Sequence, residues 1–261
     1  MGMKDPRSIL ITGASAGIGA ALARAYAGPG VTLILGGRNP ERLAAVAAAC
    51  RAAGAEVTSA AIDVTDAAAL AAWIAEADQR RPIDLVIANA GMTGGDAGDG
   101  NGESLADVQR IMGVNFGGVC NTLHPLIPAL RQRQRGQLVL MSSLAALRGL
   151  PYSPAYCASK AALKAYGEAL GAWLRADGIE VSIVLPGFVD THLSRHVSGP
   201  KPLQITAERA ALLIRRRLER GPAVIAFPFL LYAGIRVLAL LPAALADFIL
   251  CFVTVSIRRY E

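Results

Sequence analysis

Short apolar runs alternate with longer Ala-rich stretches of helical periodicity along most of the chain. Short apolar runs bounded by turn-forming residues are typical of strands buried on both faces, as in a parallel sheet covered by helices. The pattern therefore predicts an α/β fold with a single doubly wound, Rossmann-like parallel sheet and helices on both faces, in a domain spanning 1–226. The expected strands are 8–12, 31–35, 56–62, 84–88, 137–141, 180–185 and 223–226, and the expected helices end at 27 or span 40–53, 65–79, 114–132, 154–176 and 207–220.

The pattern changes in an apolar C-terminal helical extension, 227–261. Between 222 and 257 only Arg236 and Asp247 are charged, and two prolines interrupt the stretch. Its uncharged runs are shorter than the roughly 18 residues of a confident membrane span, so two broken helices in a membrane interface are favoured. A cover over a substrate cleft or an oligomer interface is the alternative. The arginines expected to attract anionic lipid to the stretch 222–259 are Arg215, Arg216, Arg217, Arg220, Arg258 and Arg259.

Composition narrows the function classes. Hydrophobic residues make up 53% of the 261 residues, which excludes a disordered chain. The net charge of +6 comes without a nucleic-acid-binding signature and with only 5% aromatic residues, so nucleic acid is not an expected partner. The four cysteines show no metal-ligand or disulfide spacing, and the loop 91–102 lacks the calcium-loop pattern, so no metal is expected. A cytoplasmic protein is predicted, with the extension able to meet the cytoplasmic face of a membrane.

A glycine-rich loop joins the first expected strand to the first helix. It reads Thr-Gly-Ala-Ser-Ala-Gly-Ile-Gly over 12–19. Gly13 permits a tight turn, and Gly17 and Gly19 let backbone and helix approach a pyrophosphate at the helix N-terminus. The same residues also match the G-x-S-x-G elbow of hydrolases, with Ser15 as nucleophile. That elbow needs an earlier strand and loop for its oxyanion hole, which this position does not offer.

A second motif, Tyr-x-x-x-Lys, places Tyr156 and Lys160 on one face of a helix. An ammonium beside a phenol favours the phenolate and lowers the tyrosine pKa, which makes the hydroxyl a usable proton donor or acceptor. Other polar or glycine-containing segments end neighbouring strands, where ligands bind in open α/β sheets. These are Ser142-Ser143, Asn89-Ala90-Gly91 and Pro186-Gly187, with Asn115 in the helix that follows the fourth strand.

These motifs, in this order and spacing, resemble those of the short-chain dehydrogenase/reductase family over about 7–226. The resemblance implies that Tyr156 is the catalytic acid/base and that Ser143 holds the substrate oxygen. Lys160 would bind the nicotinamide ribose and tune Tyr156, and Asn115 would support a water relay to Lys160. The other residues implied to bind the cofactor are Gly13, Ser15, Gly17, Ile18, Gly19, Asp63, Val64, Asn89, Ala90, Gly91, Pro186, Gly187, Val189 and Thr191.

The end of the second strand bears on the choice of cofactor. NAD enzymes usually place an acidic residue there for the ribose hydroxyls, but this chain has Gly37 followed by Arg38. A guanidinium suits a 2′-phosphate, so NADP(H) is expected in preference to NAD(H), with Ser15 and Arg42 as further contacts.

The expected function is therefore an NADP(H)-dependent oxidoreductase that interconverts a carbonyl and a secondary alcohol on a lipophilic substrate. Candidate substrates are 3-oxoacyl chains, a keto-sphingoid base or a ketosteroid, among which the sequence does not choose. The resemblance also implies a homodimer. The alternatives are a membrane-associated NADP-binding scaffold without turnover and the hydrolase that uses Ser15.

Overall fold

A parallel sheet forms the centre of the computed structural model, which describes residues 3, 5–94, 102–150, 153–195, 197–251 and 256–257. Seven strands are hydrogen-bonded in the order β10-β6-β5-β4-β1-β2-β3, and every neighbouring pair is parallel. The order reverses between β1 and β4, which is where open α/β sheets bind their ligands. The strands are β1 (Ser8–Thr12), β2 (Thr32–Gly37), β3 (Glu56–Ala61), β4 (Leu85–Ala88), β5 (Gly136–Met141), β6 (Ile179–Pro186) and β10 (Val224–Phe227).

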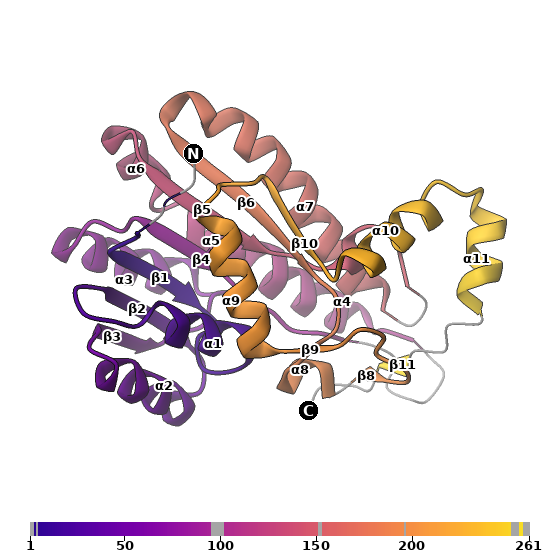
Figure 1. Cartoon of the computed structure of the whole chain (residues 1–261), viewed down its shortest axis with the longest axis horizontal. Helices are drawn as coiled ribbons and strands as arrows, with labels where there is room; N and C mark the ends of the chain where they lie inside the picture. The colour runs from indigo at the N-terminus through magenta and orange to yellow at the C-terminus, as the bar shows by residue number, and fades with distance from the viewer. Residues whose placement is uncertain are drawn as a thin grey trace.

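Helices cover both faces of this sheet (Figure 1). Alternate residues of β1 show why: Ile9 and Ile11 pack with the helices of one face, whereas Leu10 packs with those of the other. All three side chains are fully buried, so the predicted doubly wound sheet is confirmed. One face carries α1 (Gly17–Tyr26), α2 (Pro40–Ala52) and α9 (Ala207–Leu218), and the other carries α3 (Ala67–Arg80), α5 (Gly118–Leu123) and α7 (Pro154–Leu174).

The expected single helix 114–132 was wrong in its start and its continuity. The helical segment begins earlier, at α4 (Leu105–Met112), where Ser104 Oγ accepts a hydrogen bond from the Asp107 backbone N–H at 3.1 Å. It continues through a π-helical turn, η1 (Gly113–Gly117), into α5 and is interrupted before α6 (Ile127–Arg133). Pro125 lies in the interruption, where its missing N–H prevents a regular helix.

Short elements that the sequence pattern did not predict follow β5 and β6. They include the 3-10 turn η2 (Leu144–Ala146), the helix α8 (His192–Arg195) and the strand pair β7 (Val189–Asp190) and β9 (Ile205–Thr206). Elements of two to four residues carry too few side chains for a periodic pattern. A second strand pair joins β8 (Val197–Ser198) to β11 (Ser256–Ile257).

The C-terminal extension contains two helices, as predicted: α10 (Phe229–Leu238) and α11 (Ala243–Cys251). Both project from one end of the sheet, beyond α4 and α7 (Figure 1). Within the part of the chain that the structure describes, no helix has the length and apolarity needed to cross a bilayer. Most of the expected surface loop 91–102, together with Arg258 and Arg259, lies outside the described residues.

Candidate active site

The glycine-rich loop is packed tightly against the end of β4. Gly13 and Gly17 have φ angles of +65° and +55°, in the left-handed region that favours glycine. A Cβ built on Gly13 would lie 2.8 Å from Ala90 Cα, and one on Gly19 would lie 2.3 Å from the Gly13 carbonyl oxygen. No side chain fits at either position. Gly17, Ile18 and Gly19 form the first turn of α1, whose N–H groups have no helical partner and suit an anion.

Asn89 and Thr12 join β4 to the glycine-rich loop. The Asn89 side-chain amide donates to the carbonyl oxygens of Thr12 and Gly13, at 3.0 and 3.2 Å. The Thr12 hydroxyl oxygen accepts from the backbone N–H groups of Asn89 and Ala90, at 3.1 and 3.2 Å. The Asn89 amide therefore holds the loop in place, a role that the sequence motif did not reveal.

Arg38 and Asp63 lie together at the ends of β2 and β3. Hydrogen bonds from the Thr65 backbone N–H and hydroxyl hold the pKa of the Asp63 carboxyl below its usual range, and the nearby Arg38 charge acts in the same direction. Arg38 itself is exposed. Gly37 packs against the glycine-rich loop, since a Cβ on it would lie 3.1 Å from Ser15 Cβ. The structure thus gathers the residues expected at the adenosine end, Ser15, Arg38 and Asp63, at one edge of the sheet.

Ser143, Tyr156 and Lys160 meet at the carboxyl ends of β5 and β6. Ser143 is the second residue after β5, and its Oγ accepts from the Ala145 backbone N–H at 3.1 Å. Tyr156, in the first turn of α7, lies close enough to Ser143 for the Ser143 hydroxyl to lower the Tyr156 pKa. Lys160 lies one turn further on; its Nζ donates to the Met141 carbonyl oxygen at 2.9 Å and lies 5.7 Å from the centroid of the Tyr156 ring. The Ser and Tyr hydroxyls can therefore bind one substrate oxygen together.

Burial dominates the electrostatics of this group. It raises the pKa of the Tyr156 hydroxyl, which the nearby Ser143 hydroxyl only partly offsets. Burial also lowers the pKa of the Lys160 ammonium to about 8. The expectation that Lys160 lowers the Tyr156 pKa was wrong for this structure, because desolvation favours the neutral phenol and the ammonium is hydrogen-bonded to Met141.

Asn115 is fully buried in the π-helical turn η1. Its Oδ1 accepts from the Met92 N–H at 2.8 Å, and its Nδ2 donates to the Met92 carbonyl oxygen at 3.0 Å and to Ser159 Oγ at 2.9 Å. Asn115 therefore ties the segment after β4 to the catalytic helix α7. A Cβ on Gly91 would lie 3.3 Å from Asn115 Oδ1 and 3.4 Å from Lys160 Nζ, so these two polar groups flank the same glycine.

The segment after β6 reaches the glycine-rich loop. Ser143 Oγ lies 3.5 Å from the Pro186 carbonyl oxygen, and a Cβ on Gly17 would lie 3.1 Å from Thr191 Cγ2. Val189 pairs with Ile205 in the β7–β9 ladder. Of the expected nicotinamide residues, Pro186 thus lies beside Ser143 and Thr191 beside the first turn of α1, whereas Gly187 lies against Leu144 and Leu231.

Glu103 is a residue of the site that sequence reasoning missed. Its Oε2 accepts from the Ala155 N–H at 2.8 Å, at the N-terminus of α7 next to Tyr156. The helix has no side-chain cap of its own, because the Ser153 hydroxyl donates to the Gly94 carbonyl oxygen instead. Burial raises the pKa of the Glu103 carboxyl. A carboxylate far from the helix in sequence gives no local capping signal.

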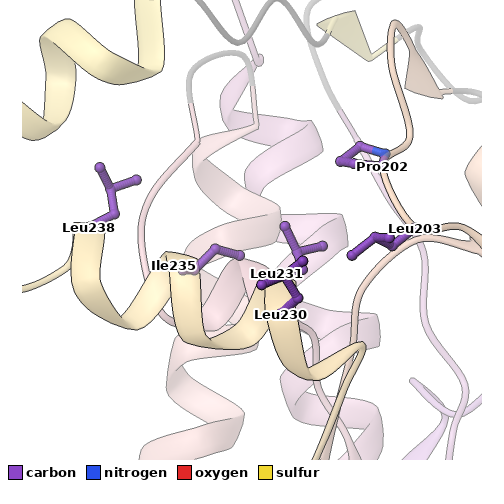
Figure 2. A pocket seen from close by; sticks show the side chains of 7 residues that line it. Pro202, Leu203, Leu230, Leu231, Ile235 and Leu238 are labelled. Carbon is purple, nitrogen blue, oxygen red and sulfur yellow. The ribbon is translucent and has the colours of Figure 1, made fainter.

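An apolar groove of about 390 Å³ opens beside the site, between α10 and the loop before β9. Leu231 and Leu203 face one another across it (Figure 2). A Cβ on Gly187 would lie 3.1 Å from Leu231 Cδ2 and 3.3 Å from Leu144 Cδ1, so the wall of the groove reaches the residue after Ser143. The lining residues are Pro202, Leu203, Leu230, Leu231, Gly234, Ile235 and Leu238.

Comparison with known proteins agrees with this geometry. The sequence model of the short chain dehydrogenase family matches residues 7–201. An uncharacterized oxidoreductase of Myxococcus xanthus is 37% identical over 244 residues, covering 92% of this chain and 95% of that protein. The ketoacyl reductase HetN of Nostoc sp. is 32% identical over 212 residues, covering 78% of this chain and 72% of that protein.

Solved structures share the same architecture. A short chain dehydrogenase/reductase from Burkholderia phymatum, crystallised in complex with NAD, is similar with a TM-score of 0.81 and 26% identity, covering 90% of this chain and 94% of that chain. The similar region extends past the family-model match, and thus includes elements after β9.

Proposed function

Because the chain belongs to the short-chain dehydrogenase/reductase family and is an NAD(P)-dependent oxidoreductase, we propose that it reduces the carbonyl group of a lipophilic substrate, with NADPH as the preferred cofactor. The observation that carries the proposal is the neighbouring Ser143–Tyr156 pair. An apolar groove approaches this pair through Leu231, which lies against Gly187, and Gly187 also lies against Leu144, the residue after Ser143. The pair suits a carbonyl oxygen, and the groove suits an apolar chain attached to it.

Different residues of the site have different roles in carbonyl reduction. Nicotinamide, when bound, supplies the hydride that reduces the carbonyl carbon. Ser143 and Tyr156 donate hydrogen bonds to the carbonyl oxygen as its negative charge grows, and Tyr156 transfers its proton to that oxygen. The Tyr156 hydroxyl is protonated at neutral pH, as proton donation to the substrate oxygen requires. Lys160 and Asn115 flank Gly91. We propose that the Tyr156 phenolate is reprotonated from this side of the site.

The glycine-rich loop fits a dinucleotide. The positions that exclude a Cβ, Gly13 and Gly19, leave α1 with a bare N-terminal turn for the pyrophosphate. At the adenosine end the preference for NADPH rests on Arg38, an exposed guanidinium beside Asp63 that suits a 2′-phosphate.

The substrate class rests on the groove and on the relatives. HetN is described as a ketoacyl reductase, as is a Streptomyces virginiae protein of monensin polyketide synthesis that is 32% identical over 216 residues. A 3-oxoacyl group places its ketone beside a chain of methylenes, which matches a polar pair followed by an apolar groove. Neither the scaffold without turnover nor the Ser15 hydrolase is favoured, since these relatives are oxidoreductases.

The decisive experiment replaces Tyr156 by Phe, which removes the hydroxyl and keeps the ring. We expect NADPH oxidation with a 3-oxoacyl thioester to fall by about a hundredfold or more, because the general acid is lost. NADPH affinity, measured by fluorescence titration, should change by less than about twofold, since uniform binding is untouched. Turnover of Tyr156→Phe at the wild-type rate would refute the role of Tyr156. Absence of NADPH binding by the wild type would refute NADPH as the preferred cofactor.

A further inference from the structure

Large apolar side chains are exposed on the two C-terminal helices. We define the α10–α11 surface as Phe229, Leu230, Val237, Leu240, Leu245 and Phe248; Leu240 and Phe229 are 83% and 77% exposed. Single exposed apolar residues are ordinary, but five on α10 and α11 together with Leu240 in the turn between them are typical of an interaction site.

The helix α10 is apolar on both sides but covered on only one. Leu231, Tyr232 and Ile235 pack against the buried cluster of Leu144, Ile183 and Leu185, and no residue of α10 is fully buried. A soluble surface helix normally has one apolar stripe and an opposite polar face. Arg236 is the one charged residue of α10, so the outer face of this helix is far more apolar than water contact favours.

The charges around this surface favour an anionic partner. Arg236 is exposed on α10, and Lys201 directly precedes Pro202, a lining residue of the groove, in sequence. The acidic residue of α11, Asp247, forms an ion pair with Arg148 at 2.5 Å, so its negative charge is compensated. Apolar side chains bordered by basic residues are the composition of helices that lie in the interface of anionic membranes.

We propose that α10 and α11 dock on the surface of an anionic lipid bilayer, with their exposed apolar side chains in the interface and Arg236 near the headgroups. The helices have ten and nine residues, so they lie along the surface and do not cross it. Leu230 belongs both to this surface and to the groove, so docking brings the mouth of the groove to the lipid. This last point rests on the proposed lipophilic substrate, whereas docking itself does not.

The test is flotation of the full-length chain with vesicles. Wild-type protein should float with vesicles of phosphatidylcholine and phosphatidylglycerol, and the double variant Leu240→Glu/Phe248→Glu should bind at least about tenfold more weakly. Leu212→Glu, a matched change at an exposed leucine of α9, should bind like the wild type. Arg236→Gln should lower affinity by about fivefold on anionic vesicles and leave weak binding to pure phosphatidylcholine unchanged.

A second measurement keeps the proposal testable if the double variant folds poorly. The variant Leu240→Trp preserves an apolar side chain, and its fluorescence should be quenched by vesicles whose acyl chains carry bromine. Absence of flotation or of quenching with the full-length protein would overturn the proposal. So would a concentration-dependent dimer that the double variant abolishes, because the surface would then belong to a second copy. Turnover of a short, water-soluble ketone should be equal in wild type and double variant, so a failure of docking is distinguishable from a failure of the proposed reduction.

Discussion

Individual side chains of the site have been taken out of water at a cost that the local hydrogen bonds only partly offset. The Lys160 ammonium donates to the Met141 carbonyl oxygen, and its pKa lies well below the value of a free lysine. The same desolvation shifts the pKa of the Tyr156 hydroxyl in the opposite direction, upward. Residue types and spacing identify such groups from sequence, but the burial that sets their protonation depends on the folded chain.

The Lys160 pKa predicts a pH dependence of stability. An unfolded lysine binds a proton more tightly than the folded one, so the free energy of unfolding rises with pH between about 8 and 10.5 and is reduced below pH 8. From pH 7 to pH 9 this contribution amounts to about 1 kcal/mol. Urea unfolding of wild type and Lys160→Met should therefore show a smaller rise in the variant. All other titrating groups are the same in the two proteins, so only Lys160 can make their profiles differ. Parallel pH profiles would therefore contradict the prediction.

Arg38 predicts the cofactor preference. In Arg38→Gln the 2′-phosphate loses a charge-assisted partner, and the KM for NADPH should rise by about tenfold or more, whereas the KM for NADH changes little. Arg80→Gln is the matched control, since Arg80 ends α3, pairs with Glu76 and lies away from the glycine-rich loop. Steady-state kinetics with both cofactors provides the measurement; equal effects on NADPH and NADH would argue against a phosphate contact.

The positions of the strands and of most helices can be predicted from local sequence patterns, whereas the irregular segments that connect them cannot. Buried strands such as 8–12 and 84–88 were predicted within a residue or two, because burial on both faces demands apolar residues in the interior of the strand. The π-helical turn η1 was missed, since one extra residue in a turn leaves no trace in a helical pattern. The partners of Asn115 were also missed, because backbone groups of Met92 carry no sequence signal.

The Glu103 cap at the N-terminus of α7 predicts a measurable contribution to stability. Glu103→Ala removes the acceptor of the Ala155 N–H, and the free energy of unfolding should fall by about 1 kcal/mol, as for the loss of other N-terminal caps. Glu103→Gln keeps an acceptor oxygen and should stay close to the wild type. Glu41→Ala is the control, because Asn39 already caps α2. Chemical denaturation measures all three, and equal losses for Glu103→Ala and Glu41→Ala would exclude the cap.

At the scale of the whole molecule, the C-terminal extension is built onto the edge of the catalytic centre. Gly187 is bordered by Pro228 and Leu231 on one side and by Leu144 on the other, and its N–H donates to the Phe227 carbonyl oxygen at 2.7 Å. The apolar composition of the extension was evident in the sequence, and its two helices were predicted. The groove between α10 and the loop before β9 was not, because it joins segments far apart in the chain.

The groove predicts how substrate length is selected. A Cβ on Gly234 meets no atom within 4 Å, so Gly234→Leu fills the groove without displacing the backbone. We expect kcat/KM for long 3-oxoacyl thioesters to fall by about tenfold or more, while short ones change by less than about twofold. Ala239→Leu places a leucine at an exposed position at the end of α10, outside the groove lining. It should leave kcat/KM unchanged for long and short thioesters alike. Equal losses for long and short chains would place the apolar chain elsewhere.

The close approach of Gly37 to Ser15 has an evolutionary consequence. An acidic residue at 37, which would serve the ribose hydroxyls of NAD, brings a Cβ to within 3.1 Å of Ser15 Cβ and 3.3 Å of its backbone nitrogen. The glycine-rich loop must then shift by a few tenths of an ångström, or residue 15 must become smaller. An exchange of one nucleotide for the other through an acidic residue at position 37 therefore needs an accompanying adjustment at the glycine-rich loop, either of its position or of residue 15.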